Sequence, residues 1–151
     1  MLGAVVFGLA LAAEGAHPHV IENLAEASWG PAPNMLPPGA QIEVLGGNPM
    51  GDSLFTVRLK FPAGYRIPAH SHPRDEHVTV LSGKLHIGMG DKLDPAGGKA
   101  LGVGGFGLMP ANANHFAYCN EATTILLHGW GPIEFKYVNP ADDPRNQKAA
   151  S

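Results

Sequence analysis

The chain has 151 residues, of which 44% are hydrophobic and only 15% charged, and its formal net charge is −3. This length makes one domain with one core, and the hydrophobic content excludes a disordered chain. The mild negative balance excludes the basic surface that nucleic acid or an anionic membrane would require. The 20 glycines and 14 prolines predict many tight turns, which favours short strands over long helices.

The first 13 residues form an apolar run, MLGAVVFGLALAA, which is too short to span a bilayer. Its Ala10-Leu11-Ala12 is a small-x-small site of the kind that signal peptidase cuts, although no Lys or Arg precedes the run. We therefore expect residues 1–13 to be a signal peptide and the protein to be periplasmic or secreted, without stable membrane insertion. The alternative is a buried N-terminal strand or helix in a cytoplasmic protein.

Residues 14–39 are rich in proline and alanine and predict an extended arm, with room for a short helix only within 21–29. Residues 40–138 contain short stretches in which apolar and polar residues alternate, separated by Gly, Pro or Asn. The predicted strands are 54–61, 76–81, 84–88, 105–109, 115–119, 123–129 and 133–138. Many short strands favour an antiparallel sandwich or barrel, and the polar residues 139–151 predict a loosely docked tail.

Histidine is unusually frequent, at eight residues, and two neighbouring histidines suggest a metal site. His70 and His72 are two apart, so both rings project from one face of an extended strand. Glu76 has the same parity and can meet them if residues 73–75 bend, and His115 can complete the set from a facing strand. Three imidazoles and a carboxylate suit one divalent transition metal (Fe(II), Mn, Ni, Co or Zn) and leave coordination positions open.

A two-residue turn at Ser82-Gly83 predicts a hairpin with three cross-strand pairs, Val80–Leu85, Val78–Ile87 and Glu76–Met89. One face of this hairpin is apolar except for Glu76. A lone carboxylate among apolar side chains is costly without a cation or hydrogen bond, which indicates that Glu76 is a ligand. His77 then points outward, near His86, although a ligand role for His77 in place of Glu76 stays open.

These segments resemble the two motifs of the cupin superfamily. The first motif, G-x5-H-x-H-x3/4-E-x6-G, is matched by Gly64, His70, His72, Glu76 and Gly83. The second, G-x5-P-x-G-x2-H-x3-N, is matched by Gly104, Pro110 and His115, whereas Asn112 replaces its Gly and Cys119 its Asn. The resemblance implies one all-β domain, a jelly-roll β-barrel (double-stranded β-helix), with a metal on His70, His72, Glu76 and His115. A metal-free cupin is the alternative.

The interior of such a barrel would form the substrate pocket. The side chains that we expect to line it are Phe55, Val78, Met89, Cys119 and His128. For Cys119 the alternative is a small buried thiol, and for His128 a structural role.

The resemblance implies a mononuclear metal-dependent oxygenase, similar to dioxygenases, acting on a small organic substrate such as a diketone, phenol or acid. Glu76 would serve as ligand or as catalytic base. The alternatives are a cupin isomerase or lyase, and a non-enzymatic zinc- or ligand-binding sensor module. The partners expected are a small molecule and a second copy of the chain, because open sheet edges and the outer-face Leu81 and Thr79 favour a homodimer.

Overall fold

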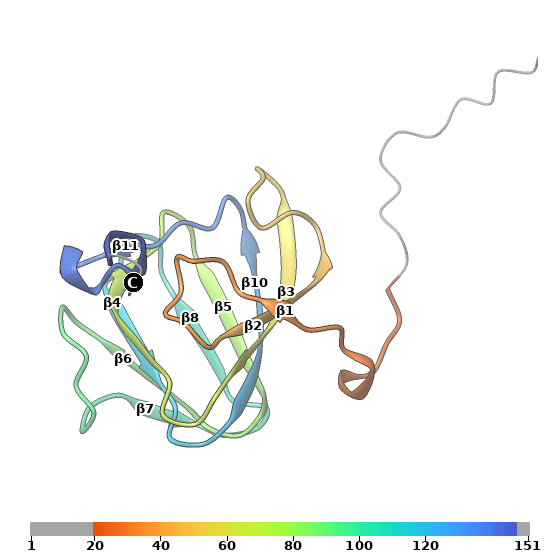
Figure 1. Cartoon of the computed structure of the whole chain (residues 1–151), viewed down its shortest axis with the longest axis horizontal. Helices are drawn as coiled ribbons and strands as arrows, with labels where there is room; N and C mark the ends of the chain where they lie inside the picture. The colour runs from red at the N-terminus through yellow and green to blue at the C-terminus, as the bar shows by residue number, and fades with distance from the viewer. Residues whose placement is uncertain (1–19, 148–151) are drawn as a thin grey trace, which may run out of the picture.

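The computed structural model describes residues 20–147, which form two facing antiparallel β-sheets (Figure 1). One sheet has the strand order β1 (Gly30–Pro31), β2 (Gln41–Gly46), β3 (Leu54–Phe61), β10 (Thr123–Trp130), β5 (Glu76–Ser82) and β8 (Phe106–Met109). The other has the order β11 (Lys136–Tyr137), β4 (Arg66–Ser71), β9 (His115–Tyr118), β6 (Leu85–Met89) and β7 (Lys99–Leu101). We call them sheet A and sheet B. The prediction of an all-β jelly roll is confirmed.

The core lies between the sheets, as the alternation in β3 predicts. Phe55, Val57, Leu59 and Phe61 point inward and are at most 5% exposed. Burying these four side chains contributes roughly 1.5–3 kcal/mol each before entropy is counted. The inward faces of β4, β5, β6, β9 and β10 complete the core.

The predicted hairpin at Ser82-Gly83 is wrong, because β5 and β6 belong to different sheets. In sheet A β5 pairs with β10 and β8, whereas in sheet B β6 pairs with β9 and β7. Gly83 turns the corner with φ of 75°, and a Cβ there would lie 2.4 Å from the carbonyl oxygen of Ala122. The Thr123 hydroxyl fixes this corner, since it accepts from the Lys84 amide and donates to the Lys84 carbonyl.

The segment before β2 covers part of sheet A. A short 3-10 helix, η1 (Leu24–Glu26), lies within the range where a helix was expected. Beside it Arg58 pairs with Glu22 at 2.6 Å and with Glu43 at 3.0 Å, which fixes the segment over the outer face of β2 and β3. The predicted signal peptide, residues 1–13, lies outside the described residues. Within the described residues, the structure contains no helix that is both long and apolar enough to span a membrane.

The tail after β11 folds into two 3-10 helices, η2 (Pro140–Asp142) and η3 (Pro144–Asn146). Asn139 and Asp143 cap them by accepting hydrogen bonds from the amides of Ala141 and Arg145. The described part of the tail therefore has a regular structure, packed beside β11 and β4 (Figure 1).

Candidate metal centre

Four polar side chains meet between the sheets at one end of the barrel. His70 lies near the end of β4, His72 just after it, and His115 begins β9, where it pairs with His70 in sheet B. The chain bends at residues 73–74, so Glu76 begins β5 in sheet A and faces the histidines from the opposite wall. The three histidines are at most 4% exposed and Glu76 is 9% exposed.

The geometry of the cluster is compact. The ring centroids of His70 lie 4.9 Å from His72 and 4.4 Å from His115, and one ligand atom of each histidine lies within 4.8 Å of the others. The Glu76 carboxylate approaches the Nε2 atoms of His72 and His115 at 3.6 and 3.4 Å. Such a group can hold a metal ion.

Main-chain carbonyls orient all three rings. The Nδ1 atoms of His70, His72 and His115 contact the carbonyl oxygens of Pro68 (2.7 Å), Glu134 (2.6 Å) and Ala113 (2.9 Å). Because a carbonyl can only accept, each Nδ1 carries a proton, and the neutral form of each ring therefore presents its lone pair at Nε2. Within the described residues the buried Nε2 atoms of His72 and His115 have no hydrogen-bond partner. Buried lone pairs beside a carboxylate fit a bound cation.

The protonation states fit the same role. Burial, with smaller contributions from His115 and His72, lowers the pKa of His70 to about 3, so this imidazole is neutral at physiological pH. Burial by itself raises the pKa of the Glu76 carboxyl, but His72, His115 and His70 outweigh it and hold that pKa at about 2. A neutral imidazole and an ionised carboxylate are the forms that bind a divalent metal.

An interior cavity with a volume of about 80 Å³ lies against the cluster. Its polar lining comes from His70, Glu76 and His115, and the other lining side chains are apolar. Phe135 closes one side, with its ring stacked on His70 at 4.7 Å and set edge-on to His72 at 4.5 Å. The cavity therefore suits a small, largely apolar molecule in contact with His70, Glu76 and His115.

The predicted pocket residues divide into two groups. Phe55 and Val78 line the cavity. Met89, Cys119 and His128 do not, and these three predictions are corrected. Met89 is 57% exposed at the far end of β6; Cys119 is buried in the core, with its thiol 3.4 Å from the Pro62 carbonyl.

The remaining histidines of the two sheets lie outside the cluster. His128 points away from the cavity because its strand neighbour Leu127 points inward, and its ring lies 4.8 Å from that of His77. His77 thus faces outward on β5, which disfavours the alternative in which it replaces Glu76. His86 does not lie beside His77 as expected, since it stacks on Tyr118 in sheet B.

Several cavity residues were missing from the sequence prediction. Phe135 and Ile133 line the cavity from the segment before β11, and Met35 and Leu36 line it from the arm before β2. The alternation of Ile133, Phe135 and Tyr137 is a signal that could have found the first pair. No periodic pattern marks the second pair, since it lies in a proline-rich turn.

Comparisons with known proteins place this geometry in a family. The structure is similar to a candidate acetylacetone dioxygenase from Methylibium petroleiphilum PM1 (TM-score 0.63, 21% identity, 95% of this chain and 90% of that one). It is also similar to the polyketide cyclase RemF from Streptomyces resistomycificus (TM-score 0.64, 14% identity, 84% and 90%) and to KdgF from Halomonas sp. (TM-score 0.55, 20%, 76% and 96%). At these identities the likeness shows the fold alone.

Sequence comparison gives the family. A search of the curated proteins found no match. The family model described as the ChrR cupin-like domain matches residues 17–134, which is more than three quarters of the chain and contains the whole histidine cluster. The chain therefore belongs to the ChrR cupin-like family of the cupin superfamily.

Proposed function

We propose that the chain binds one divalent transition metal through His70, His72, His115 and Glu76, and that it is an oxygenase for a small organic substrate. One observation carries the proposal: three buried imidazoles converge with a carboxylate beside an otherwise apolar cavity, whose wall includes His70, His115 and Glu76. When bound, the metal would supply Lewis acidity and open coordination positions for substrate and dioxygen.

The residues of the chain divide the work. The carbonyls behind His70, His72 and His115 fix the ring orientation before the metal arrives, which preorganises the ligand set. The apolar lining, with Phe55 and Val78 among its members, holds the carbon skeleton of the substrate and excludes water. Glu76 is the carboxylate that can hold a proton taken from the substrate.

The substrate class follows from the lining. A cavity without a cationic side chain disfavours a charged group on the part of the substrate inside the barrel, so a diketone or a phenol fits better than a polyacid. The candidate acetylacetone dioxygenase among the structural neighbours supports including β-diketones in the test.

The test is metal analysis of the purified protein, followed by oxygen uptake after loading with Fe(II), Mn, Ni, Co or Zn over a panel of diketones and phenols. We expect uptake with at least one metal and substrate class, and its loss in His72→Ala. His77→Ala is the matched control, because it removes a histidine that follows Glu76 in β5 but points away from the cavity. Substrate consumption without oxygen uptake would instead indicate an isomerase or lyase.

A second candidate function is a non-enzymatic metal- or ligand-binding module. The cavity favours it in one respect: among the described residues that line it, the acid–base groups are Glu76, His70 and His115, and all three belong to the proposed metal shell. Tight metal binding with saturable ligand binding, and no turnover of any panel compound, would support this alternative.

We also propose that the chain forms a homodimer through the outer face of sheet A near its edge. The edge strand β8 exposes Phe106 and Leu108, at 55% and 48%, beside Thr79 and His77 of β5. An apolar edge strand left in water invites pairing with another chain. Sedimentation should give a dimer at micromolar concentration, and Phe106→Glu should shift it to a monomer; a wild-type monomer of about 15.8 kDa would contradict the proposal.

A further inference from the structure

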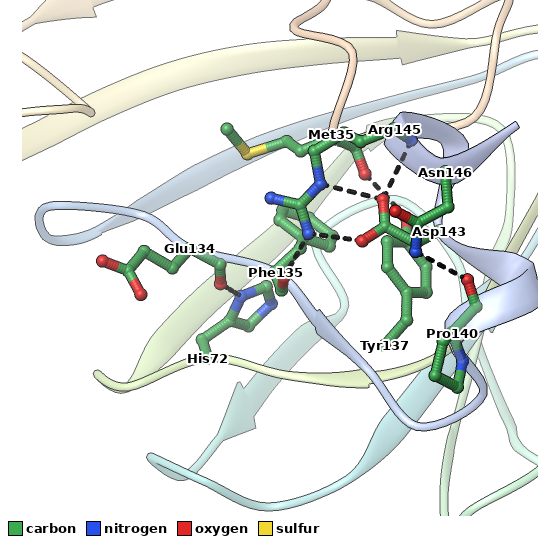
Figure 2. A network of polar contacts seen from close by, with 9 residues as sticks. All are labelled: Met35, His72, Glu134, Phe135, Tyr137, Pro140, Asp143, Arg145 and Asn146. Carbon is green, nitrogen blue, oxygen red and sulfur yellow. Dashed lines mark hydrogen bonds and ion pairs between the residues drawn. The ribbon is translucent and has the colours of Figure 1, made fainter. Parts of the chain in front are cut away.

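The C-terminal tail reaches the contacts that orient one metal-binding histidine. Figure 2 shows that His72 points its Nδ1 at the carbonyl of Glu134, while Arg145 contacts the carbonyl of the next residue, Phe135, at 2.8 Å. We propose that Arg145 is a positioning residue for the metal centre, acting through the segment that carries these two carbonyls. This inference rests on the proposed metal-binding function.

The guanidinium of Arg145 is itself held in place. Its Nε and Nη2 donate to the two carboxylate oxygens of Asp143 at 2.8 and 2.7 Å, a two-pronged geometry that fixes the plane of the group (Figure 2). The same pairing lowers the pKa of Asp143 and raises that of Arg145, so both stay charged across the physiological range. The third contact, from Nη2 to the Phe135 carbonyl, is therefore made by a preorganised donor.

The segment that receives this contact makes few main-chain hydrogen bonds of its own. Between the end of β10 and the start of β11, the main chain is held by the amides of Gly131 and Ile133, which donate to Ser53 and Pro49. The next two carbonyls, those of Glu134 and Phe135, are instead bonded by the side chains of His72 and Arg145. A planar peptide group links the Glu134 carbonyl to the Phe135 amide, so a shift of Phe135 moves the acceptor of His72.

Phe135 provides a second route to the same ligands. Its ring stacks on His70 and meets His72 edge-on, and it is only 7% exposed. Losing the Arg145 contact frees both the carbonyl that orients His72 and the ring that packs against two imidazoles. Replacing groups that orient metal ligands typically costs 10–100-fold in metal affinity, and Arg145 acts one step further out. We therefore expect an effect at the low end, about tenfold.

Arg66 gives a matched control. Its guanidinium also donates to a main-chain carbonyl, that of Cys119, at 3.0 Å, and it pairs with Asn120. It lies at the start of β4, at the opposite end of that strand from His70. Loss of Arg66 should therefore cost similar stability while leaving the metal ligands in place.

The experiment compares wild type, Arg145→Met and Arg66→Met, using Co²⁺ as the probe. We expect Arg145→Met to bind Co²⁺ about tenfold more weakly in competition with a chelator and to change the visible absorption of the Co²⁺-loaded protein. Arg66→Met should leave both unchanged. In the metal-free protein, the imidazole ¹⁵N shifts of His72 should show the Nδ1–H tautomer in wild type and a tautomer mixture in Arg145→Met.

Each other result overturns the inference. Wild-type affinity, spectrum and tautomer in Arg145→Met would show that the tail does not position His72, whatever the melting temperature. An equal loss of affinity in Arg66→Met would assign the effect to general loosening. If Arg145→Met does not fold, Asp143→Asn replaces it. We then expect an affinity loss of about threefold for Co²⁺, and wild-type affinity in Asp143→Asn would overturn the inference. A wild-type chain that does not bind Co²⁺ would refute the metal centre itself, while the tautomer measurement still tests the positioning role.

Discussion

Two groups of histidines lie on opposite sides of the barrel wall, and spacing alone does not distinguish them. The rings of His70, His72 and His115 are 4.4–5.2 Å apart inside, and those of His77 and His128 are 4.8 Å apart outside. The inner rings are buried, each is fixed by a carbonyl, and a carboxylate faces two of them. The outer rings are half-buried, and that of His77 lies edge-on to Phe106.

Proximity of imidazoles alone therefore does not make a metal site. A site needs a fixed tautomer, lone pairs that no hydrogen bond uses, and a negative charge that only a cation can compensate. The inner group meets these requirements and the outer group does not.

Removing one inner histidine should have the largest effect. We expect His70→Ala, His72→Ala or His115→Ala to lose most of the bound metal, because each removes one of the four proposed ligands. The outer variants His77→Ala and His128→Ala should retain it. Metal per chain after dialysis, measured by atomic emission, checks this. Equal loss from His77→Ala and Glu76→Ala would show that the side of β5 facing the metal has been assigned wrongly.

The second largest effect should be the loss of stability in acid, to which the inner histidines contribute more than the outer ones. The pKa of His70 is about 3 in the folded chain and 6.5 when unfolded, so the unfolded state binds more protons between these values. The stability of the metal-free protein should therefore fall as the pH drops from 6.5 towards 3, by up to about 4 kcal/mol from this group. Urea unfolding across this range tests it: His70→Gln should flatten the dependence.

His128 serves as the internal comparison for that measurement. Burial and the nearby His77 also lower its pKa, but its half-exposed ring shifts less than that of His70. His128→Gln should therefore flatten the acid dependence less than His70→Gln does. If His128→Gln flattened the pH dependence of stability more than His70→Gln, the difference between the inner and outer histidines would be contradicted.

Metal should stabilise the fold by mass action. At free metal a few hundred times above the dissociation constant, the gain is about 3–4 kcal/mol, and it should weaken in acid, because protons compete with the metal for its ligands. Melting temperatures with and without Mn, Fe(II), Ni or Zn at pH 5–8 measure it. His77→Ala should respond like wild type and His115→Ala should not; an unmoved wild-type curve at every pH would identify a metal-free cupin.

Glu76→Gln should have the smallest effect on the metal-free fold. Without a bound cation, a carboxylate buried among apolar side chains is costly, so at pH 8 the amide should be as stable or more stable by about 1 kcal/mol. Metal binding should nevertheless weaken, because the amide lacks the negative charge. Paired unfolding and metal titrations are the check, and a metal-free variant less stable by more than 1 kcal/mol would argue against this account.

Side-chain parity was predictable from the sequence, but strand partners were not. The alternation in β3 and β5 placed Phe55, Val78 and Glu76 on inner faces, where the structure has them. The same alternation cannot reveal which strand lies opposite. The corner at Gly83 therefore looked like a hairpin, although Ala122 and Thr123 of a distant strand occupy the space beside it.

The errors at the pocket have the same origin. Met89 and Cys119 have suitable parity, yet Met89 is 57% exposed, and Cys119 follows β9 and packs in the core against the Pro62 carbonyl. Met35 lies in a proline-rich turn and Arg145 in a 3-10 helix of one turn, and contacts made by such short segments have no periodic signature. The acceptors of the three ligand histidines were equally hidden, since they are main-chain oxygens.

The use of main-chain oxygens as acceptors determines which positions around the centre can change in sequence. An oxygen of the main chain survives any substitution at Pro68, Ala113 or Glu134 that preserves the path of the backbone. Two of these three acceptors lie two residues before the histidine they orient, so they travel with it in sequence. Substitutions should therefore impair the centre at its ligands and at the few residues that shape the segment around Glu134. The positions that supply the acceptor oxygens should tolerate other side chains.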